Sequence, residues 1–182
     1  MEQGVSPATA VAINAELYSP TYVALDAGGN LYIADRGNDR VRVLLTNGTI
    51  STVASNGAAG SDGDGGSALS AQVIAWGLAA SPSGALYISG TGATETIRVL
   101  TPSQSGQSPA SQFTISTVAG NGNVGFSGDG GPATSAEFNT AIGIAADSGG
   151  NLYIADYNNN RVRKVTSGGI ITPELCTRSA SR

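Results

Sequence analysis

Residues 147–165 read Asp147-Ser-Gly-Gly-Asn-Leu-Tyr-Ile-Ala-Asp-Tyr-Asn-Asn-Asn-Arg-Val-Arg-Lys-Val165, and the same pattern occurs twice more in the chain. A close copy covers Asp26–Asp35 and continues as Arg-Val-Arg-Val at 40–43. A weaker copy covers Ser81–Ser89 and continues as Ile-Arg-Val-Leu at 97–100. Self-similarity at such spacings is typical of proteins built from tandem repeats. The sequence therefore predicts three consecutive copies of one structural unit.

Each unit contains four short stretches with strand character. In the first unit they cover Tyr22–Asp26, Leu31–Asp35, Arg40–Leu44 and Thr49–Ala54. These stretches are apolar or β-branched, and turn residues that tolerate positive φ separate them, which favours tight hairpins. No long stretch has the 3.6-residue period of an amphipathic helix. We therefore expect an all-β fold of four-stranded antiparallel sheets, stacked as the blades of a propeller.

The third unit resembles an NHL repeat. The similarity rests on Gly-Asn-Leu-Tyr-Ile-Ala-Asp-Tyr-Asn-Asn-Asn-Arg-Val-Arg-Lys-Val at 150–165 and on the preceding Gly-Phe-Ser-Gly-Asp-Gly-Gly-Pro-Ala-Thr-Ser at 125–135. It extends from about Pro7 to Ile171 and is strongest in the first and third units. The resemblance implies a β-propeller, commonly with six blades, that serves as a binding surface or a sensor domain. A minority of related propellers are lactonases or lyases.

The expected organisation is an incomplete propeller of about three NHL-type blades. Closed propellers have about 4–8 blades, so three units indicate a fragment of a longer protein, a broken reading frame, or a protomer that completes a ring with a second copy. We favour the fragment. Because Pro173 cannot donate to a sheet ladder, the last strand should stop early or lie at an edge. The expected segments are a lead-in at 1–19, blade 1 at 20–54, blade 2 with long loops at 55–119, blade 3 with a truncated last strand at 120–172 and an irregular tail at 173–182.

Composition excludes several kinds of active site. The 182 residues include no histidine and one cysteine, with nine basic against thirteen acidic residues, for a net charge of −4. Without histidine the chain cannot supply a Ser-His-Asp or Cys-His nucleophile or a His-ligated zinc, so an enzyme would depend on carboxylates. The acidic balance disfavours nucleic acid as a partner.

The sequence does not decide the cellular compartment. No apolar run approaches the ~20 residues needed to span a bilayer. The start, Met1–Pro7, lacks the basic and apolar regions of a signal peptide. The protein is therefore either cytoplasmic or the interior of a longer exported one.

Repetition separates architectural residues from candidate binding residues. Asp35 with Arg40, and Asp156 with Arg161, occupy the same place in two units. We therefore interpret each pair as structural, with the acid accepting from turn amides and pairing with the base. Strand parity brings the loops after the second and fourth strands of every blade to one rim, and long variable loops are where binding usually resides. The candidate binding residues on this rim are Arg36, Asn38, Asp39, Trp76, Glu95, Tyr157, Asn158, Asn159 and Asn160. For Trp76, a packed core aromatic is an equal alternative.

Two glycine-rich loops resemble calcium ligand runs. They carry Asp62, Asp64 and Asp129, and carboxylates alternating with glycine can wrap a hard cation. An EF-hand loop would continue to a distant Glu and a helix, neither of which is present. We therefore favour glycine-rich turns with one structural aspartate each. No cofactor is expected, and calcium is kept as a weak candidate.

Three functions stay open at this point. The leading hypothesis is a non-enzymatic propeller segment that binds a protein or carbohydrate on its rim. The alternative is part of a divalent-metal-dependent lactonase- or lyase-like enzyme, which needs several inward carboxylates that converge on one point. The expected innermost strands carry acids only at their ends, so binding leads. A purely structural repeat without a defined ligand is the third.

Overall fold

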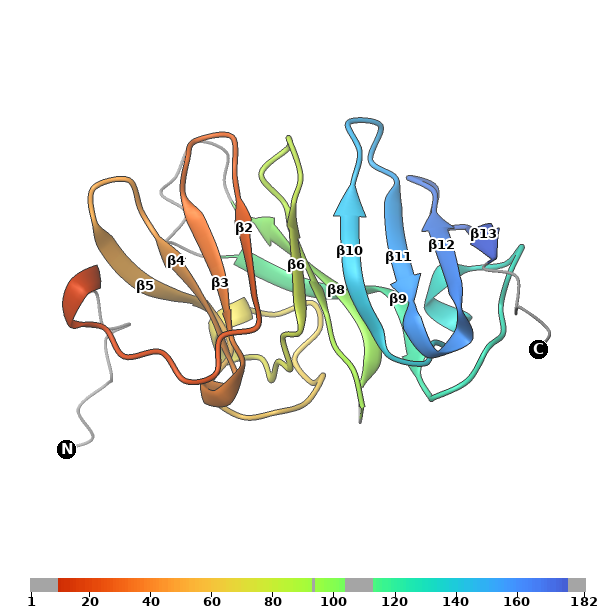
Figure 1. Cartoon of the computed structure of the whole chain (residues 1–182), viewed down its shortest axis with the longest axis horizontal. Coiled ribbons are helices and arrows are strands. Elements are labelled where there is room, and N and C mark those ends of the chain that lie inside the picture. The colour runs from red at the N-terminus through yellow and green to blue at the C-terminus, as the bar shows by residue number, and fades with distance from the viewer. Residues whose placement is uncertain (1–9, 93, 104–112, 177–182) are drawn as a thin grey trace, which may run out of the picture.

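The computed structural model describes residues 10–92, 94–103 and 113–176, and the strands within them form three antiparallel sheets (Figure 1). Blade 1 contains, from inner to outer edge, β2 (Tyr22–Leu25), β3 (Leu31–Asp35), β4 (Arg40–Leu44), β5 (Thr49–Ala54) and the short β1 (Ala10–Val11). Blade 2 contains β6 (Gly77–Ala80), β7 (Leu86–Ser89), β8 (Glu95–Pro102) and β9 (Phe113–Gly122). Blade 3 contains β10 (Ala141–Ala146), β11 (Leu152–Asp156), β12 (Arg161–Val165) and β13 (Ile171–Cys176).

Helical structure is limited to single turns. In the described ranges these are 3-10 turns at Ala12–Asn14, Arg36–Asn38, Ala68–Ser70, Ala133–Ser135 and Tyr157–Asn159. The predicted all-β fold of three blade-like sheets is therefore confirmed. Among these residues, no helix is long and apolar enough to cross a membrane.

The first hairpin turn of blades 1 and 3 repeats the same hydrogen bonds. The Asp26 carboxylate accepts from the backbone and side-chain nitrogens of Asn30, both at 2.9 Å. The Asp147 carboxylate accepts from Asn151 in the same way, at 2.8 Å. In the blade 1 turn, Gly29 adopts the left-handed conformation, with φ +81°, in which a side chain would be strained. The Asp-x-Gly-Gly-Asn stretch thus closes the hairpin by itself.

The two faces of each blade contact different neighbours, because successive side chains of a strand point to opposite faces. We call the face that meets the preceding blade the leading face, and the one that meets the following blade the trailing face. In blade 1, Tyr32 and Ala34 lie on the trailing face and pack against blade 2. In blade 2, Leu86 and Ile88 lie on the leading face and complete that contact.

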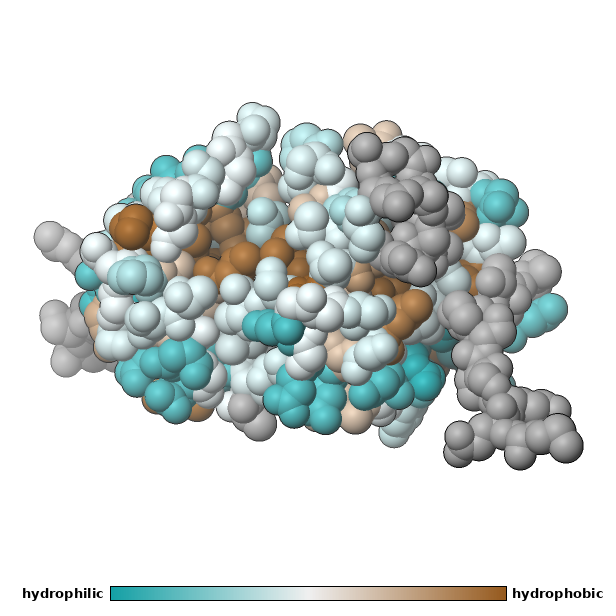
Figure 2. Space-filling view, turned by 180° about the vertical axis from the view of Figure 1, so that it is seen from behind, coloured by the Kyte–Doolittle hydropathy of each residue, from teal (hydrophilic) through white to brown (hydrophobic). Residues whose placement is uncertain are grey.

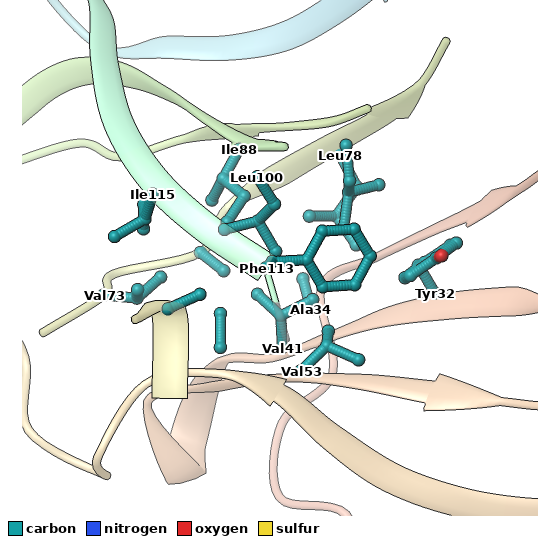
Figure 3. Close-up of a cluster of buried hydrophobic side chains, with 14 of the residues drawn as sticks. Tyr32, Ala34, Val41, Val53, Val73, Leu78, Ile88, Leu100, Phe113 and Ile115 are labelled. Carbon is teal, nitrogen blue, oxygen red and sulfur yellow. The ribbon is translucent and has the colours of Figure 1, made fainter. Parts of the chain in front are cut away.

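The interface between blades 1 and 2 is the larger described core cluster. Figure 3 shows Phe113 of β9 at its centre, between Leu100 and Leu78 of blade 2 and Val41 and Val53 of blade 1. A second cluster joins blades 2 and 3; its buried members include Ile97, Ala119, Phe138, Ile144, Leu152, Ile154, Val165 and Ile171. Burying a side chain of this size contributes about 1.5–3 kcal/mol. Blade-to-blade packing therefore carries most of the apolar burial.

The last strand extends beyond residue 172, the end expected from Pro173. β13 pairs with β12 up to Cys176, and Pro173 lies opposite Arg163. A register shift lies between Val162 and Arg163, as it does at the matching positions of blades 1 and 2. Because β13 is the edge of its sheet, the missing N–H breaks no ladder on its other side. The edge position foreseen for proline is therefore what the structure shows.

Candidate functional site

The long connections gather at one end of the blades. Figure 1 shows the tight hairpins β2–β3, β4–β5, β6–β7 and β10–β11 at the upper end, and the connections β3–β4 and β11–β12 with the linkers 55–76 and 123–140 at the lower end. In Figure 2 hydrophilic residues collect along that lower edge, below a more apolar band. We call this end the long-loop rim. It is the surface on which the sequence predicted binding.

Each linker is fastened to the next blade by one arginine. Arg98 donates from Nε to Asp64 at 3.1 Å and from Nη1 to the Gln72 carbonyl at 2.7 Å. Arg163 donates from Nε to Asp129 at 2.9 Å and from Nη1 to the Glu137 carbonyl at 2.7 Å. Both guanidinium groups are buried. Sequence reasoning missed these arginines, although they recur at one place in two units.

The arginines explain the aspartates that were considered for calcium. Burial raises the pKa of the Asp64 carboxyl, but hydrogen bonds from Thr117 and Arg98 outweigh burial and hold that pKa below its usual range. Asp129 likewise accepts from Arg163. Asp62 offers its backbone carbonyl to Arg98, at 3.4 Å. Asp64 and Asp129 thus bind arginine side chains of this chain. In residues 10–92, 94–103 and 113–176 no group of three or more His, Cys, Asp or Glu is placed to hold a metal ion.

The repeated aspartates anchor the rim from inside the fold. Asp35 is buried and accepts from the Tyr18 amide at 2.8 Å and the Asn38 side chain at 2.9 Å. The arginine that approaches its carboxylate is Arg42, at 3.8 Å, two residues beyond the expected Arg40. Arg40 instead lies beside Gly57 in the linker.

Blade 3 repeats this arrangement. Asp156 accepts from the Asn139 amide at 2.8 Å and from the Asn159 side chain at 2.9 Å. The cation beside it is Arg163, at 3.6 Å, whereas Arg161 lies over the Phe126 ring at 4.2 Å. Strand geometry allows this, because residues two apart in a strand share a face and Arg163 therefore lies on the same face as Arg161. The carboxylates therefore hold their loops and the arginine on their own face.

Two of the candidate asparagines, Asn158 and Asn159, donate hydrogen bonds to neighbouring loop residues. Asn158 donates from its side chain to Asn139 at 3.0 Å and to Thr140 at 2.8 Å. Asn159 also donates to the Gly125 carbonyl at 2.8 Å. Asn160 and Asp39 occupy the left-handed position that ends each 3-10 turn, with φ +53° and +49°. Their backbone conformation explains a short polar residue at both places.

Glu95 does not lie on the accessible rim as expected. Its side chain is 1% exposed. The carboxylate accepts from the Gly92 amide at 2.9 Å and from the Thr140 and Ala141 amides at 3.0 and 3.4 Å. Blade 2 has Gly90 where the other blades have the anchoring aspartate, and Glu95 ties the start of β10 to blade 2. Glu95 is therefore an architectural residue.

Trp76 and Arg36 form a contact that the other blades lack. The Arg36 guanidinium carbon lies 4.0 Å from the centre of the Trp76 ring and joins blade 1 to blade 2 at the rim. Nε of Arg36 is buried without a hydrogen-bond partner, so the indole face is its main neighbour. Both side chains are half-buried, and such a cation–π contact contributes about 0.5–2 kcal/mol.

A surface hollow and exposed aromatics lie close to this pair. The Thr21 hydroxyl donates to the Ala75 carbonyl at 3.3 Å, which brings residues 20–23 beside Trp76. Pro20–Val23 line part of a hollow of about 380 Å³. Tyr18, which sequence reasoning missed, packs over Gly37 and leaves most of its ring exposed. Indole, phenol and guanidinium groups are thus available together at the inner edge of the rim.

Family models match the two strong units. The NHL repeat model matches residues 17–44 and 138–165, and these ranges contain the anchoring aspartates with their arginines. The chain therefore contains two NHL repeats. A search of curated proteins found no significant match.

The fold agrees with solved propeller-type structures. A structural genomics protein from Bacteroides thetaiotaomicron is 24% identical over 85% of this chain and 35% of its own, with a TM-score of 0.61. A gluconolactonase from Xanthomonas campestris is 18% identical over 91% of this chain and 50% of its own, with a TM-score of 0.59. An auxiliary nutrient binding protein from Bacteroides ovatus is 16% identical over 91% of this chain and 38% of its own, with a TM-score of 0.61. The NHL-repeat chain therefore spans about a third to a half of these structures.

Proposed function

We propose that this NHL-repeat chain is a non-enzymatic binding or sensor module that takes a protein or carbohydrate ligand on the long-loop rim. The observation that carries the proposal is the Arg36–Trp76 contact at the rim, with the exposed ring of Tyr18 packed over the neighbouring Gly37. Indole and phenol rings offer flat apolar surface with a polar edge, which suits sugar rings and peptide side chains alike. Asparagine side chains around the turn at Tyr157–Asn159 add hydrogen-bonding groups at the same rim.

The carboxylates support binding over catalysis. Asp35, Asp156 and Glu95 accept hydrogen bonds from backbone amides inside the fold. Asp26 and Asp147 accept from the turns that they close. A general acid or base must reach the reacting atom, and these groups face their own loops.

A single tryptophan makes the binding proposal directly testable. Trp76 is the only tryptophan in the sequence, so the indole emission of the native chain reports on this one site. Neutral oligosaccharides and a library of soluble peptides are titrated separately against the chain. We expect one of the two panels to give a saturable change in emission, and Arg36→Ala to weaken that binding at least tenfold. The matched control is Arg161→Ala, which removes another arginine–aromatic contact, with Phe126, and should leave the affinity within about twofold.

The enzyme alternative rests on a separate observation. The gluconolactonase from Xanthomonas campestris shares the fold over half of its chain, and a divalent-ion-dependent lactonase would need its carboxylates to bind the ion. Isothermal titration with Ca²⁺, Mg²⁺ and Zn²⁺ tests this directly. A stoichiometric ion that is lost in Asp26→Asn or Asp147→Asn would favour the enzyme, together with an absence of any saturable ligand at Trp76.

A further inference from the structure

The two ends of the row of blades expose different faces. Blade 1 has a leading face without a described neighbour, and blade 3 has a trailing face without one. In Figure 1 the inner strands β2, β6 and β10 lie side by side in the middle, while blade 1 fans out to the left and blade 3 to the right. The three blades therefore form an arc, with one unpaired face at each end.

The leading face of blade 1 is apolar where its counterparts are covered. Val23 lies opposite Ile33 in the sheet, as Leu78 lies opposite Ile88 and Ile144 opposite Ile154. Val23 is 55% exposed, whereas its counterparts Leu78 and Ile144 are 1% and 6% exposed. Leu25, two residues further along the same face, is also exposed. The same strand position is thus core in two blades and surface in the first.

The trailing face of blade 3 shows the complementary difference. Tyr153, Ala155, Val162 and Lys164 occupy the register positions held in blade 1 by Tyr32, Ala34, Val41 and Val43. All four blade 1 residues are buried beneath blade 2. All four blade 3 residues stay half-buried. Three of them are of the same kind as their counterparts, so this face is built to receive a leading face.

Arg42 also lies on the leading face of blade 1, but it lacks the linker contact that its counterparts make. Arg42 lies opposite Ile33, as Arg98 lies opposite Ile88 and Arg163 opposite Ile154. Arg98 and Arg163 each bind an aspartate 34 residues earlier in the chain. The residue 34 positions before Arg42 is Ala8, and the buried Nε of Arg42 has no hydrogen-bond partner. A buried guanidinium nitrogen without a partner is costly.

We propose that the leading face of blade 1 binds the trailing face of blade 3 of a second copy of this chain, and that two copies close one ring. Both internal interfaces join a trailing face to a leading face, so the two free faces match by the rule that the blades already follow. In the gluconolactonase structure, half of the protein aligns with 91% of this chain, so two arcs of this size would complete a ring of that kind. Two such contacts would leave no free face in the ring.

The test is the mass of the chain in solution. Sedimentation and light scattering of the full chain should give twice 18.1 kDa at micromolar concentration. Leu25→Asp places a carboxylate on the free leading face, and Ala155→Asp does so on the free trailing face. Each variant should weaken the dimer at least a hundredfold, while its circular dichroism keeps the strand signal of the parent chain.

Val124→Asp is the matched control. Val124 is also an exposed apolar residue, but it lies in the 123–140 linker, away from both free faces. The Val124→Asp variant should dimerise as tightly as the parent chain. A chain that is monomeric up to hundreds of micromolar overturns the proposal and assigns the free faces to further repeats of a longer polypeptide. A dimer that both face variants leave intact overturns it as well.

Discussion

Arg163 and Asp129 lie 34 residues apart in the chain, and the guanidinium donates to one carboxylate oxygen from Nε at 2.9 Å and from Nη2 at 2.7 Å. Its remaining nitrogen, Nη1, donates to the Glu137 carbonyl at 2.7 Å. Arg98 holds the preceding linker through the same set of atoms and spacings. In blades 2 and 3, one arginine thus fixes the loop that leads into the blade, and the rim takes its shape there from these contacts.

Replacing Arg163 should therefore destabilise the fold more than replacing Arg42. Arg163→Met leaves the buried Asp156 and the partly exposed Asp129 without their cation, which we expect to lower the free energy of unfolding by about 3–5 kcal/mol. Arg42→Met removes a contact with Asp35 alone, at 3.8 Å, and should cost about 1 kcal/mol. Denaturant unfolding followed by circular dichroism measures both. Equal losses would show that the linker contacts contribute nothing.

The glycines of the same loop offer a second comparison. Gly128 and Gly130 both have positive φ, +90° and +85°. A Cβ at Gly128 would lie 2.7 Å from the Ala136 backbone, whereas one at Gly130 would meet nothing within 4 Å. We expect Gly130→Ala to cost about 1–2 kcal/mol for its backbone conformation alone.

Gly128→Ala should cost clearly more than Gly130→Ala, because the linker backbone must also move. The measurement is the difference in melting temperature between the two variants under identical conditions. If the two variants have the same melting temperature, backbone strain alone explains the need for glycine at both positions. The close packing of the loop on Ala136 then contributes nothing to stability.

The strands were predictable because their signals are local. β3 (Leu31–Asp35) and β4 (Arg40–Leu44) agree with their predicted ends, since alternating apolar residues and glycine turns decide both. The linker arginines were not predicted, because the partner of Arg98 lies 34 residues away and nothing local marks it. Burial of Glu95 was missed for the same reason, since its amide partners belong to the next blade.

Glu95 should therefore act on stability and leave rim binding unchanged. Glu95→Gln replaces an acceptor oxygen by an NH₂ group that faces backbone N–H donors, which should lower the free energy of unfolding by about 2 kcal/mol. Glu16→Gln, at an exposed acidic residue, is the control and should stay within about 0.5 kcal/mol of the parent chain. Thermal unfolding gives both values. If Glu95→Gln loses ligand binding at Trp76 but keeps the melting temperature of the parent chain, Glu95 belongs to the binding site after all.

Tyr32 should make the fold sensitive to alkali. Burial, assisted by the nearby Asp26 carboxylate, raises the pKa of Tyr32 to about 12. The unfolded phenol loses its proton near pH 10, so between about pH 10 and 12 the folded state binds more protons and its stability falls as the pH rises. Below pH 10 this stability is undiminished, and the loss across the interval amounts to about 2–3 kcal/mol.

Tyr32→Phe removes this titrating group and should flatten the alkaline decline, while it costs little at pH 7 because the ring stays in the core. Urea unfolding from pH 8 to 11.5 measures the decline, and Tyr157→Phe, at a rim tyrosine that is 63% exposed, is the control. The control should keep the full decline of the parent chain. If Tyr32→Phe declines as steeply as the parent, the phenol of Tyr32 does not couple to folding, and the alkaline loss belongs to other groups.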